Sequence, residues 1–136
     1  EQEEVIEFGA GEGSPVISSL LKSQFTGTIH GYELNPVSSK LAQERISQYN
    51  LNNKYQIHNQ CFFEGFRKSQ ATYLIANPPY LPALDNDICM PALHGGIDGA
   101  GITMQLLSMG CENVLLMISA YSNPVETIEH ALNQGY

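Results

Sequence analysis

The sequence has few basic residues. Six Lys and Arg stand against 14 Asp and Glu in 136 residues, which gives a formal net charge of −8. An acidic surface of this size repels phosphate backbones, so the composition disfavours nucleic-acid binding by this chain alone. A basic partner domain could supply the missing charge.

Cysteines are also scarce, and no apolar run is long. The three cysteines are odd in number and widely separated, with no CxxC spacing. This pattern argues against a disulfide framework or a zinc site and favours a reducing, cytoplasmic compartment. The longest apolar run, residues 114–118, is far shorter than the roughly 20 residues that a membrane span needs. We therefore expect a cytoplasmic protein with no membrane segment.

Two classes of site lack a sequence signature. The four histidines share no metal-ligand spacing, so we expect no metal site. No Gly-x-Ser-x-Gly elbow is present, which leaves hydrolase chemistry without support.

What the chain does contain is a regular alternation of strand-like and helix-like segments. Its hydrophobic content of 43% and charged content of 15% are those of a globular protein, and residues 1–136 fit a single domain. Alternating strands and helices predict an α/β fold, a mainly parallel sheet with helices on both faces. The expected strands cover residues 5–8, 28–33, 54–58, 73–76 and 113–119.

Three helix starts are marked by proline, which is favoured at the first helical position, and Ser14 and Asn123 are capping residues before two of them. The three pairs are Ser14-Pro15, Asn35-Pro36 and Asn123-Pro124. Residues 102–109 predict a further helix. On the helix after Asn35, the residues expected on one apolar side are Val37, Leu41, Ile46 and Tyr49.

The fifth predicted strand poses a problem at the edge of the sheet. The sequence begins within its first strand and stops at Tyr136, where another strand would be expected. Residues 113–119 would then form a long, apolar, uncovered edge, which proteins normally avoid. We expect either that C-terminal strands are missing from this chain or that self-association covers the edge.

A glycine-rich turn follows the first strand. Glu7 is followed by Gly9-x-Gly11-x-Gly13, which we call the glycine turn (residues 9–13). Glycines let a backbone pass close to a ligand, and the N-terminus of the next helix favours a negative group. A merely tight turn is the alternative, because glycine turns are common.

Glu33 lies about 20 residues beyond the glycine turn, where open α/β sheets place a ribose-binding acid. Its carboxylate could accept hydrogen bonds from both ribose hydroxyls. A solvated acid at a strand end is the alternative. The glycine turn and Glu33 together predict an adenosine-containing cofactor, either a nicotinamide dinucleotide or S-adenosylmethionine.

The most informative feature is the acceptor turn, Asn77-Pro78-Pro79-Tyr80, directly after the fourth strand. Asn77 offers a carbonyl acceptor, the prolines aim the Pro78 carbonyl stiffly, and Tyr80 offers a flat face. These groups suit a planar –NH2 group. Because both turns follow the carboxyl ends of strands, we expect them to share one ligand crevice.

With these motifs the chain resembles the class I S-adenosylmethionine-dependent methyltransferases that methylate a planar nitrogen. The resemblance covers essentially the whole chain. It implies S-adenosyl-L-methionine as cofactor, and it implies that Asn77 and the Pro78 carbonyl accept hydrogen bonds from the –NH2 group while Tyr80 stacks on it. The catalytic residues it implies are Asn77, Pro78, Pro79 and Tyr80; the cofactor-binding residues are Glu7, Gly9, Ala10, Gly11, Gly13, Glu33, Leu34, Cys61, Phe62 and Asn77.

Residues 91–99, Pro-Ala-Leu-His-Gly-Gly-Ile-Asp-Gly, narrow the resemblance to the protein-(glutamine-N5) methyltransferases that modify release factors. This implies a protein substrate, a translation release factor. Two positions depart from the family pattern. Met90 replaces a Glu, and Cys61 replaces an Asp that contacts the adenine amine, which leaves Phe62 to stack on the adenine.

Three functions stay open at this point. The leading one is methylation of a protein glutamine amide or a similar amide. The second is N-methylation of adenine or guanine in RNA or DNA, where a flipped base would fill the same pocket; the acidic composition counts against it. The third is a catalytically silent module that binds the cofactor or a partner protein.

Overall fold

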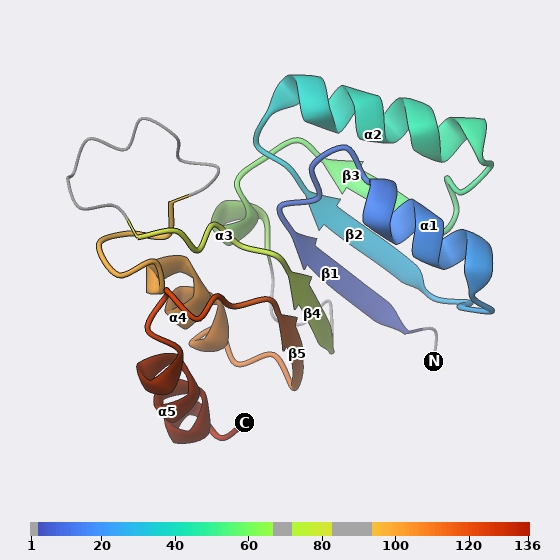
Figure 1. The fold of residues 1–136 in the computed structure, drawn as a ribbon. Coiled ribbons are helices and arrows are strands. Elements are labelled where there is room, and N and C mark those ends of the chain that lie inside the picture. The colour runs from blue at the N-terminus through green and yellow to red at the C-terminus, as the bar shows by residue number, and fades with distance from the viewer. Residues whose placement is uncertain (1–2, 67–71, 83–93) are drawn as a thin grey trace. The chain divides into compact units, whose positions relative to one another are not determined.

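The computed structural model describes residues 3–66, 72–82 and 94–136. Its five strands form one sheet in the order β3-β2-β1-β4-β5, and β1–β2 and β2–β3 pair in parallel, which confirms the predicted α/β fold (Figure 1). The chain divides into two compact units, Glu1–Ile75 and Ala76–Tyr136. The elements are β1 (Glu4–Phe8), α1 (Ser14–Lys22), β2 (Thr28–Tyr32), α2 (Pro36–Gln48), β3 (Tyr55–His58), α3 (Phe62–Gly65), β4 (Tyr73–Ala76), α4 (Gly101–Leu107), β5 (Asn113–Leu116) and α5 (Pro124–Gln134).

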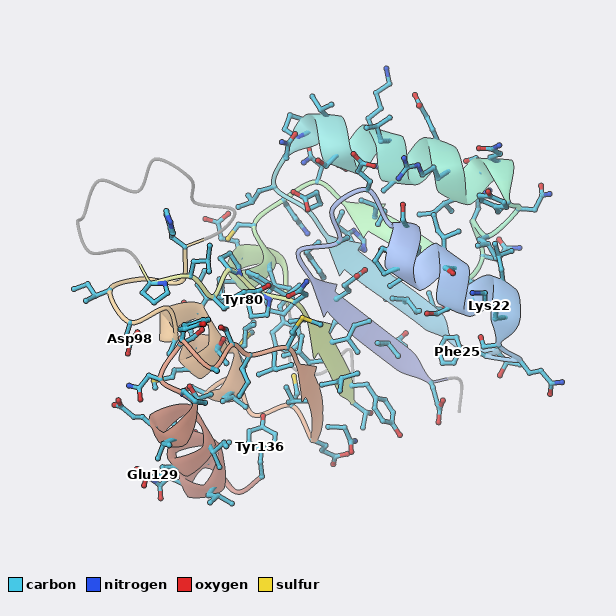
Figure 2. All side chains as sticks on the ribbon, viewed as in Figure 1. Lys22, Phe25, Tyr80, Asp98, Glu129 and Tyr136 are labelled. Carbon is cyan, nitrogen blue, oxygen red and sulfur yellow. The ribbon has the colours of Figure 1, made fainter. Side chains whose placement is uncertain are left out.

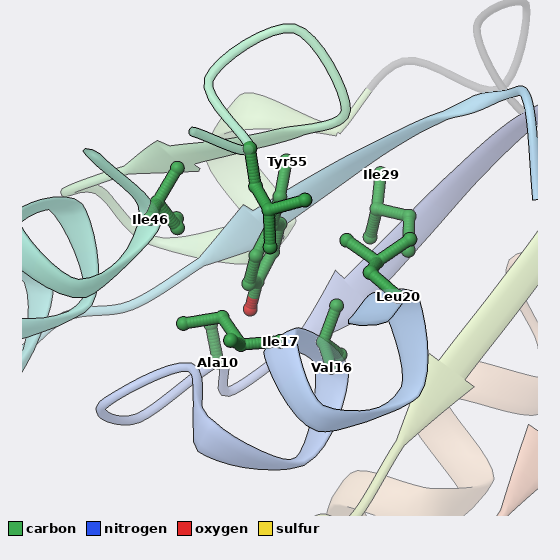
Figure 3. Close-up of a cluster of buried hydrophobic side chains, with 8 residues drawn as sticks. Ala10, Val16, Ile17, Leu20, Ile29, Ile46 and Tyr55 are labelled. Carbon is green, nitrogen blue, oxygen red and sulfur yellow. The ribbon is translucent and has the colours of Figure 1, made fainter. Parts of the chain in front are cut away.

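The core of the first unit lies between one face of its strands and the helices α1 and α2 (Figure 3). Side chains alternate between the two faces of a strand, so Ile29 and Tyr55 point into this core while their neighbours point away. The buried cluster consists of Ala10, Val16, Ile17, Leu20, Ile29, Ile46, Leu51 and Tyr55.

Both helices of this core start near the predicted places, and their caps differ from the prediction. Asn35 caps α2, because its Oδ1 accepts the N–H groups of Val37 and Ser38 at 2.9 and 3.3 Å. The prediction that Ser14 caps α1 is wrong. Gly13 takes that position with a φ of 75°, since the left-handed glycine turn runs directly into the helix, and Ser14 is the first helical residue.

The buried stripe of α2 also differs from the prediction. Val37 and Tyr49 are exposed, whereas Ser39, Ala42 and Ile46 are buried. These three positions have helical spacing. The stripe consists mainly of small residues because α2 packs closely over the glycine turn, where a Cβ on Gly13 would lie 3.3 Å from the Ala42 Cβ.

The opposite face of the first unit carries an aromatic cluster and a short helix that the sequence did not predict. The ring of Phe62 on α3 packs edge-on against Phe8 and Tyr32, with centroids 5.3 Å apart in each case. Phe8 and Tyr32 point away from α1 and α2 by the alternation of their strands. Helices therefore lie on both faces of the first unit, as predicted.

The second unit contains α4, β5 and α5. The two helices contact each other through Ser108 Oγ and His130 Nε2, which are 2.8 Å apart. Helix α5 starts after Asn123 as predicted, although the Asn123 side chain makes no cap bond and instead donates to a carboxylate oxygen of Glu126. Gly135 ends the helix with a φ of 96°.

Apolar side chains are exposed on β5 and α5. They include Leu115 on the strand and Val125, Ile128 and Leu132 on the helix. Cover for the β5 edge, by further strands or by a second copy, stays a prediction. Within the residues that the structure describes, no helix combines the length and the apolar character that crossing a membrane requires.

Candidate functional site

The glycine turn has a left-handed backbone at all three of its glycines. The φ angles of Gly9, Gly11 and Gly13 are 70°, 57° and 75°, values that side chains with a Cβ rarely adopt. A Cβ on Gly9 or Gly11 would meet nothing within 4 Å, so open space lies beside the turn. The N–H groups of Gly9 and Ala10 both donate to the carbonyl at the end of β2, at 3.0 Å. The turn is thus held by the neighbouring strand and leaves room for a ligand.

Glu33 ties the end of β2 to the glycine turn. Its Oε2 accepts the Gly11 N–H at 2.7 Å, and its Oε1 accepts the Asn35 N–H at 2.8 Å. Each carboxylate oxygen has a further lone pair, so two hydroxyl groups of a ribose can still bind. The structure therefore fits the predicted ribose role and adds a second one, fixing the turn; the ribose contact itself stays a prediction.

Glu7 is a buried carboxyl group directly before the glycine turn. It is 9% exposed, and its Oε2 accepts a short hydrogen bond from the Tyr55 hydroxyl. Burial raises the pKa of Glu7 to about 7; the Tyr55 bond opposes this rise, and the charge of Glu33 adds to it. Burial and the neighbouring Glu7 raise the pKa of Tyr55 as well. Glu7 consequently changes its charge near neutral pH.

The raised pKa of Glu7 predicts a pH-dependent stability. A carboxyl group whose pKa is raised by folding stabilises the folded state fully below its unfolded pKa of 4.5, and this contribution is lost as the pH rises to about 7. The full loss is on the order of 3 kcal/mol. We expect urea denaturation to show that the wild type becomes less stable relative to Glu7→Gln between pH 4.5 and 7. A difference in unfolding free energy between the two proteins that stays constant over that pH range would contradict the raised pKa of Glu7.

Arg45 of α2 braces the end of the glycine turn. Its guanidinium pairs with Glu12 Oε2 at 2.8 Å and donates to Ser14 Oγ at 2.7 Å. It also donates to the Glu12 carbonyl at 3.3 Å. No local sequence pattern indicates this contact, because more than 30 residues separate the partners.

The residues predicted around an adenine have different surroundings. Leu34, which follows Glu33, is 69% exposed and available to a ligand. Cys61 is half-buried at the start of α3. Phe62 is 3% exposed and stacks on Phe66 with an angle of 4° between the rings. The Phe62 ring therefore has no free face in this structure, and adenine stacking on it would require local movement.

In the acceptor turn of the second unit, an exposed asparagine directly precedes a buried proline. Asn77 is exposed, whereas Pro78 is among the most fully buried residues of the chain. Within the described residues, no side-chain or loop hydrogen bond engages the Asn77 amide or the Pro78 carbonyl oxygen. The exposed Asn77 side chain is available to a ligand, whereas Pro78, which bears the second predicted acceptor, is buried, and Pro79 and Tyr80 are half-buried.

Two glycines of residues 94–99 support the acceptor turn by close backbone contact. A Cβ on Gly95 would lie 2.4 Å from the Pro79 carbonyl oxygen, and one on Gly99 would lie 2.3 Å from that of Tyr80. Figure 2 labels Tyr80 and also Asp98, which precedes Gly99. The Gly-Gly-Ile-Asp-Gly run is therefore a support for the acceptor turn, a role that its sequence alone did not reveal.

Ser122 is a further support that the sequence analysis missed. This buried hydroxyl donates to the Tyr80 carbonyl at 2.6 Å. Asp98 Oδ1 accepts the Ala100 N–H at 3.0 Å, which fixes the supporting loop. Met90 and the other residues of 83–93 lie outside the described residues.

The histidines have structural surroundings where they are described. His30 Nδ1 and His58 Nε2 are 3.1 Å apart on neighbouring strands, and burial lowers the pKa of His58, with a smaller contribution from His30. In residues 3–66, 72–82 and 94–136, no group of three or more His, Cys, Asp or Glu side chains could hold a metal ion.

Comparison with known proteins finds methyltransferases. A curated relative, a bifunctional methyltransferase of Rickettsia prowazekii, is 29% identical over 77 residues, which are 57% of this chain and 15% of that protein. A methyltransferase from Pyrococcus furiosus matches with a TM-score of 0.68 and 18% identity, covering 99% of this chain and 65% of that one. No protein-family model matches the chain.

A geranyl diphosphate C-methyltransferase from Streptomyces coelicolor, solved with S-adenosyl-L-homocysteine, matches with a TM-score of 0.52 and 13% identity. That match covers 60% of this chain and 30% of the other. These likenesses show the fold. The chain has the class I methyltransferase fold that its motifs predicted, and it spans only a small part of the curated relative.

Proposed function

We propose that this chain is an S-adenosylmethionine-dependent methyltransferase that acts on a planar –NH2 nitrogen, with a protein glutamine amide as the acceptor. The observation that carries the proposal is the acceptor turn, with an exposed Asn77 on a buried Pro78. The fold, the open glycine turn and Glu33 support the choice of cofactor. S-adenosylmethionine supplies an electrophilic methyl group on a positive sulfonium.

The residues of the first unit fit such a cofactor. Glu7 and Glu33 have no ion-pair partner among the described residues, whose ion pairs are Lys40–Glu44 and Arg45–Glu12. A ligand with positive charge would therefore be favoured beside the glycine turn. The exposed Leu34 next to Glu33 offers apolar surface to an adenine.

The acceptor turn supports amide chemistry through two oxygen acceptors. Asn77 Oδ1 and the Pro78 carbonyl would each accept one N–H of the substrate –NH2 group, which fixes the nitrogen and orients its lone pair. Both oxygens also stabilise the positive charge that develops on the nitrogen. The nitrogen would take the methyl group that the sulfonium supplies, the electron pair of the carbon–sulfur bond would stay on sulfur, and the nitrogen would release a proton to water.

Charge favours an amide over a nucleic-acid base. The chain carries a net charge of −8 with six Lys and Arg, and an RNA or DNA strand would be repelled by it. A folded protein with a glutamine in an exposed loop needs no basic groove. A translation release factor is the specific protein acceptor that we propose to test.

Methyl transfer from tritium-labelled S-adenosylmethionine tests the proposal. The protein is incubated with a translation release factor and, separately, with protein and nucleic-acid fractions of a cell lysate. We expect label in the release factor and in the protein fraction, as N-methylglutamine after proteolysis and mass analysis. Label found only in the nucleic-acid fraction would show that the methyl acceptor is a nucleic-acid base and not a glutamine amide. Cofactor binding without any transfer would make the chain a silent binding module.

A further inference from the structure

A buried tyrosine reaches across one strand to the carboxyl group at the glycine turn. Tyr55 lies on β3 and Glu7 on β1, with β2 between them, yet the Tyr55 hydroxyl donates to Glu7 Oε2. Tyr55 is 1% exposed, and Figure 3 shows its hydroxyl end near Ala10 of the glycine turn. A single hydrogen bond thus joins the third strand to the start of the turn.

Gly31 makes this contact possible. It is paired with Glu7 in the β1–β2 register, so it lies directly between the two strands that carry the pair. A Cβ on Gly31 would lie 3.0 Å from a ring carbon of Tyr55 and 2.9 Å from the Ala10 Cβ. Glycine weakens the interior of a strand, so its presence here has a packing reason: it clears the path for the Tyr55 ring.

Among the described residues of the first unit, no positive group balances the Glu7 carboxyl. Tyr55 and Glu33 act on Glu7, and both are neutral or negative. The basic groups of the surrounding elements are engaged elsewhere: Arg45 with Glu12 and Ser14, Lys40 with Glu44, and Lys54 with the Phe25 carbonyl at 2.7 Å. Lys22 lies exposed in the last turn of α1. A positive group beside the glycine turn would be the missing counter-charge.

We propose that Tyr55 is a positioning residue that holds the Glu7 carboxyl for a cationic group of the cofactor, so that cofactor binding and ionisation of Glu7 are coupled. This inference rests on the proposed cofactor. In the free protein Glu7 carries a proton over part of the neutral range, because its pKa is near 7. A cation beside it favours the ionised form, and binding below that pH therefore releases a proton.

Isothermal titration with S-adenosylmethionine between pH 5.5 and 8.5 tests the coupling. For the wild type we expect affinity to rise by up to about tenfold per pH unit below the midpoint and to level off above it. The dependence of the binding enthalpy on the ionisation enthalpy of the buffer should show proton release below the midpoint. Glu7→Gln should bind with no such pH dependence and no proton release.

The variant Tyr55→Phe tests whether the Tyr55 hydroxyl positions Glu7 or whether the Tyr55 ring only fills space in the core. Loss of the hydroxyl removes the bond that lowers the pKa of Glu7, so the midpoint should move to higher pH. The matched control is Tyr32→Phe, which removes another buried hydroxyl, one that donates to the Gly65 carbonyl at 3.4 Å on the opposite face. It should keep the wild-type midpoint. An unshifted midpoint in folded Tyr55→Phe would contradict the role of Tyr55.

Three ligands identify the cationic group. S-adenosylmethionine carries an ammonium and a sulfonium, S-adenosylhomocysteine carries only the ammonium, and adenosine carries neither. If the affinities of S-adenosylmethionine and S-adenosylhomocysteine depend equally on pH, the ammonium is the group beside Glu7. If only the affinity of S-adenosylmethionine depends on pH, the sulfonium is that group. The affinity of adenosine should not depend on pH. Affinity for S-adenosylmethionine that is constant with pH would overturn the coupling and leave the proposed function intact. Absence of binding at every pH would overturn the proposed function itself.

Discussion

Asn77→Ala is expected to nearly abolish methyl transfer while changing the affinity for S-adenosylmethionine only modestly. The exposed Asn77 amide is the side-chain acceptor of the acceptor turn, and the buried Pro78 beneath it holds the turn in place. Removal of one group that stabilises developing charge lowers turnover by about 100- to 1000-fold. Single-turnover transfer of labelled methyl, with calorimetry for the cofactor, measures the two effects separately.

Asn53→Ala serves as the control for Asn77→Ala. Asn53 is an exposed asparagine in the turn before β3, so its removal should alter neither turnover nor affinity. Wild-type turnover in Asn77→Ala would remove this residue from the catalytic site.

Gly99→Ala is the second substitution with a large expected effect, and Gly96→Ala is its matched control. Both glycines have a positive φ, 77° and 97°, so each substitution strains the backbone. A Cβ on Gly99 would also lie 2.3 Å from the Tyr80 carbonyl oxygen, whereas one on Gly96 would meet nothing within 4 Å. Only Gly99→Ala should therefore displace the acceptor turn.

The displacement should appear in stability and in turnover. Overpacking of this kind costs about 1–3 kcal/mol, so Gly99→Ala should be less stable than Gly96→Ala by that amount in urea denaturation. Its turnover should also fall at least about tenfold below that of the control, because a small misplacement at a reacting centre has a large effect. Equal stability and equal turnover in the two variants would show that residues 94–99 do not support the turn.

The sequence revealed the parts of the site that lie in short continuous segments. The glycine turn, Glu33 and the acceptor turn each follow a strand with a clear apolar pattern, and the structure places each directly after its predicted strand. Glycines in a turn, an acid at a strand end and a Pro-Pro pair have few local alternatives, so pattern and chemistry were sufficient to find them.

The parts that were missed depend on contacts between distant segments. Tyr55 and Glu7 are 48 residues apart, and Ser122 and Tyr80 are 42 apart. No local pattern reports such pairs. Gly31 has the sequence context of an ordinary strand residue, although its lack of a Cβ leaves room for the Tyr55 ring.

The errors on helices have a similar cause. Helix α2 buries Ser39 and Ala42 because close packing over the glycine turn admits only small side chains. The sequence analysis expected Val37 and Tyr49 on the buried side because they are large and apolar, but both are exposed in the structure. Stacking of Phe62 on an adenine stays a prediction; in this structure the Phe62 ring packs against Phe8 and Phe66.

The choice of cofactor underlies every part of the proposed function, and isothermal titration of the wild-type protein with S-adenosylmethionine and with NAD tests it most directly. The open glycine turn, Glu33 and Glu7, which has no ion-pair partner among the described residues, favour a ligand with an adenosine and a positive charge. We predict saturable binding of one S-adenosylmethionine per chain and no detectable binding of NAD. Binding of NAD, or no binding of S-adenosylmethionine, would contradict the proposed function.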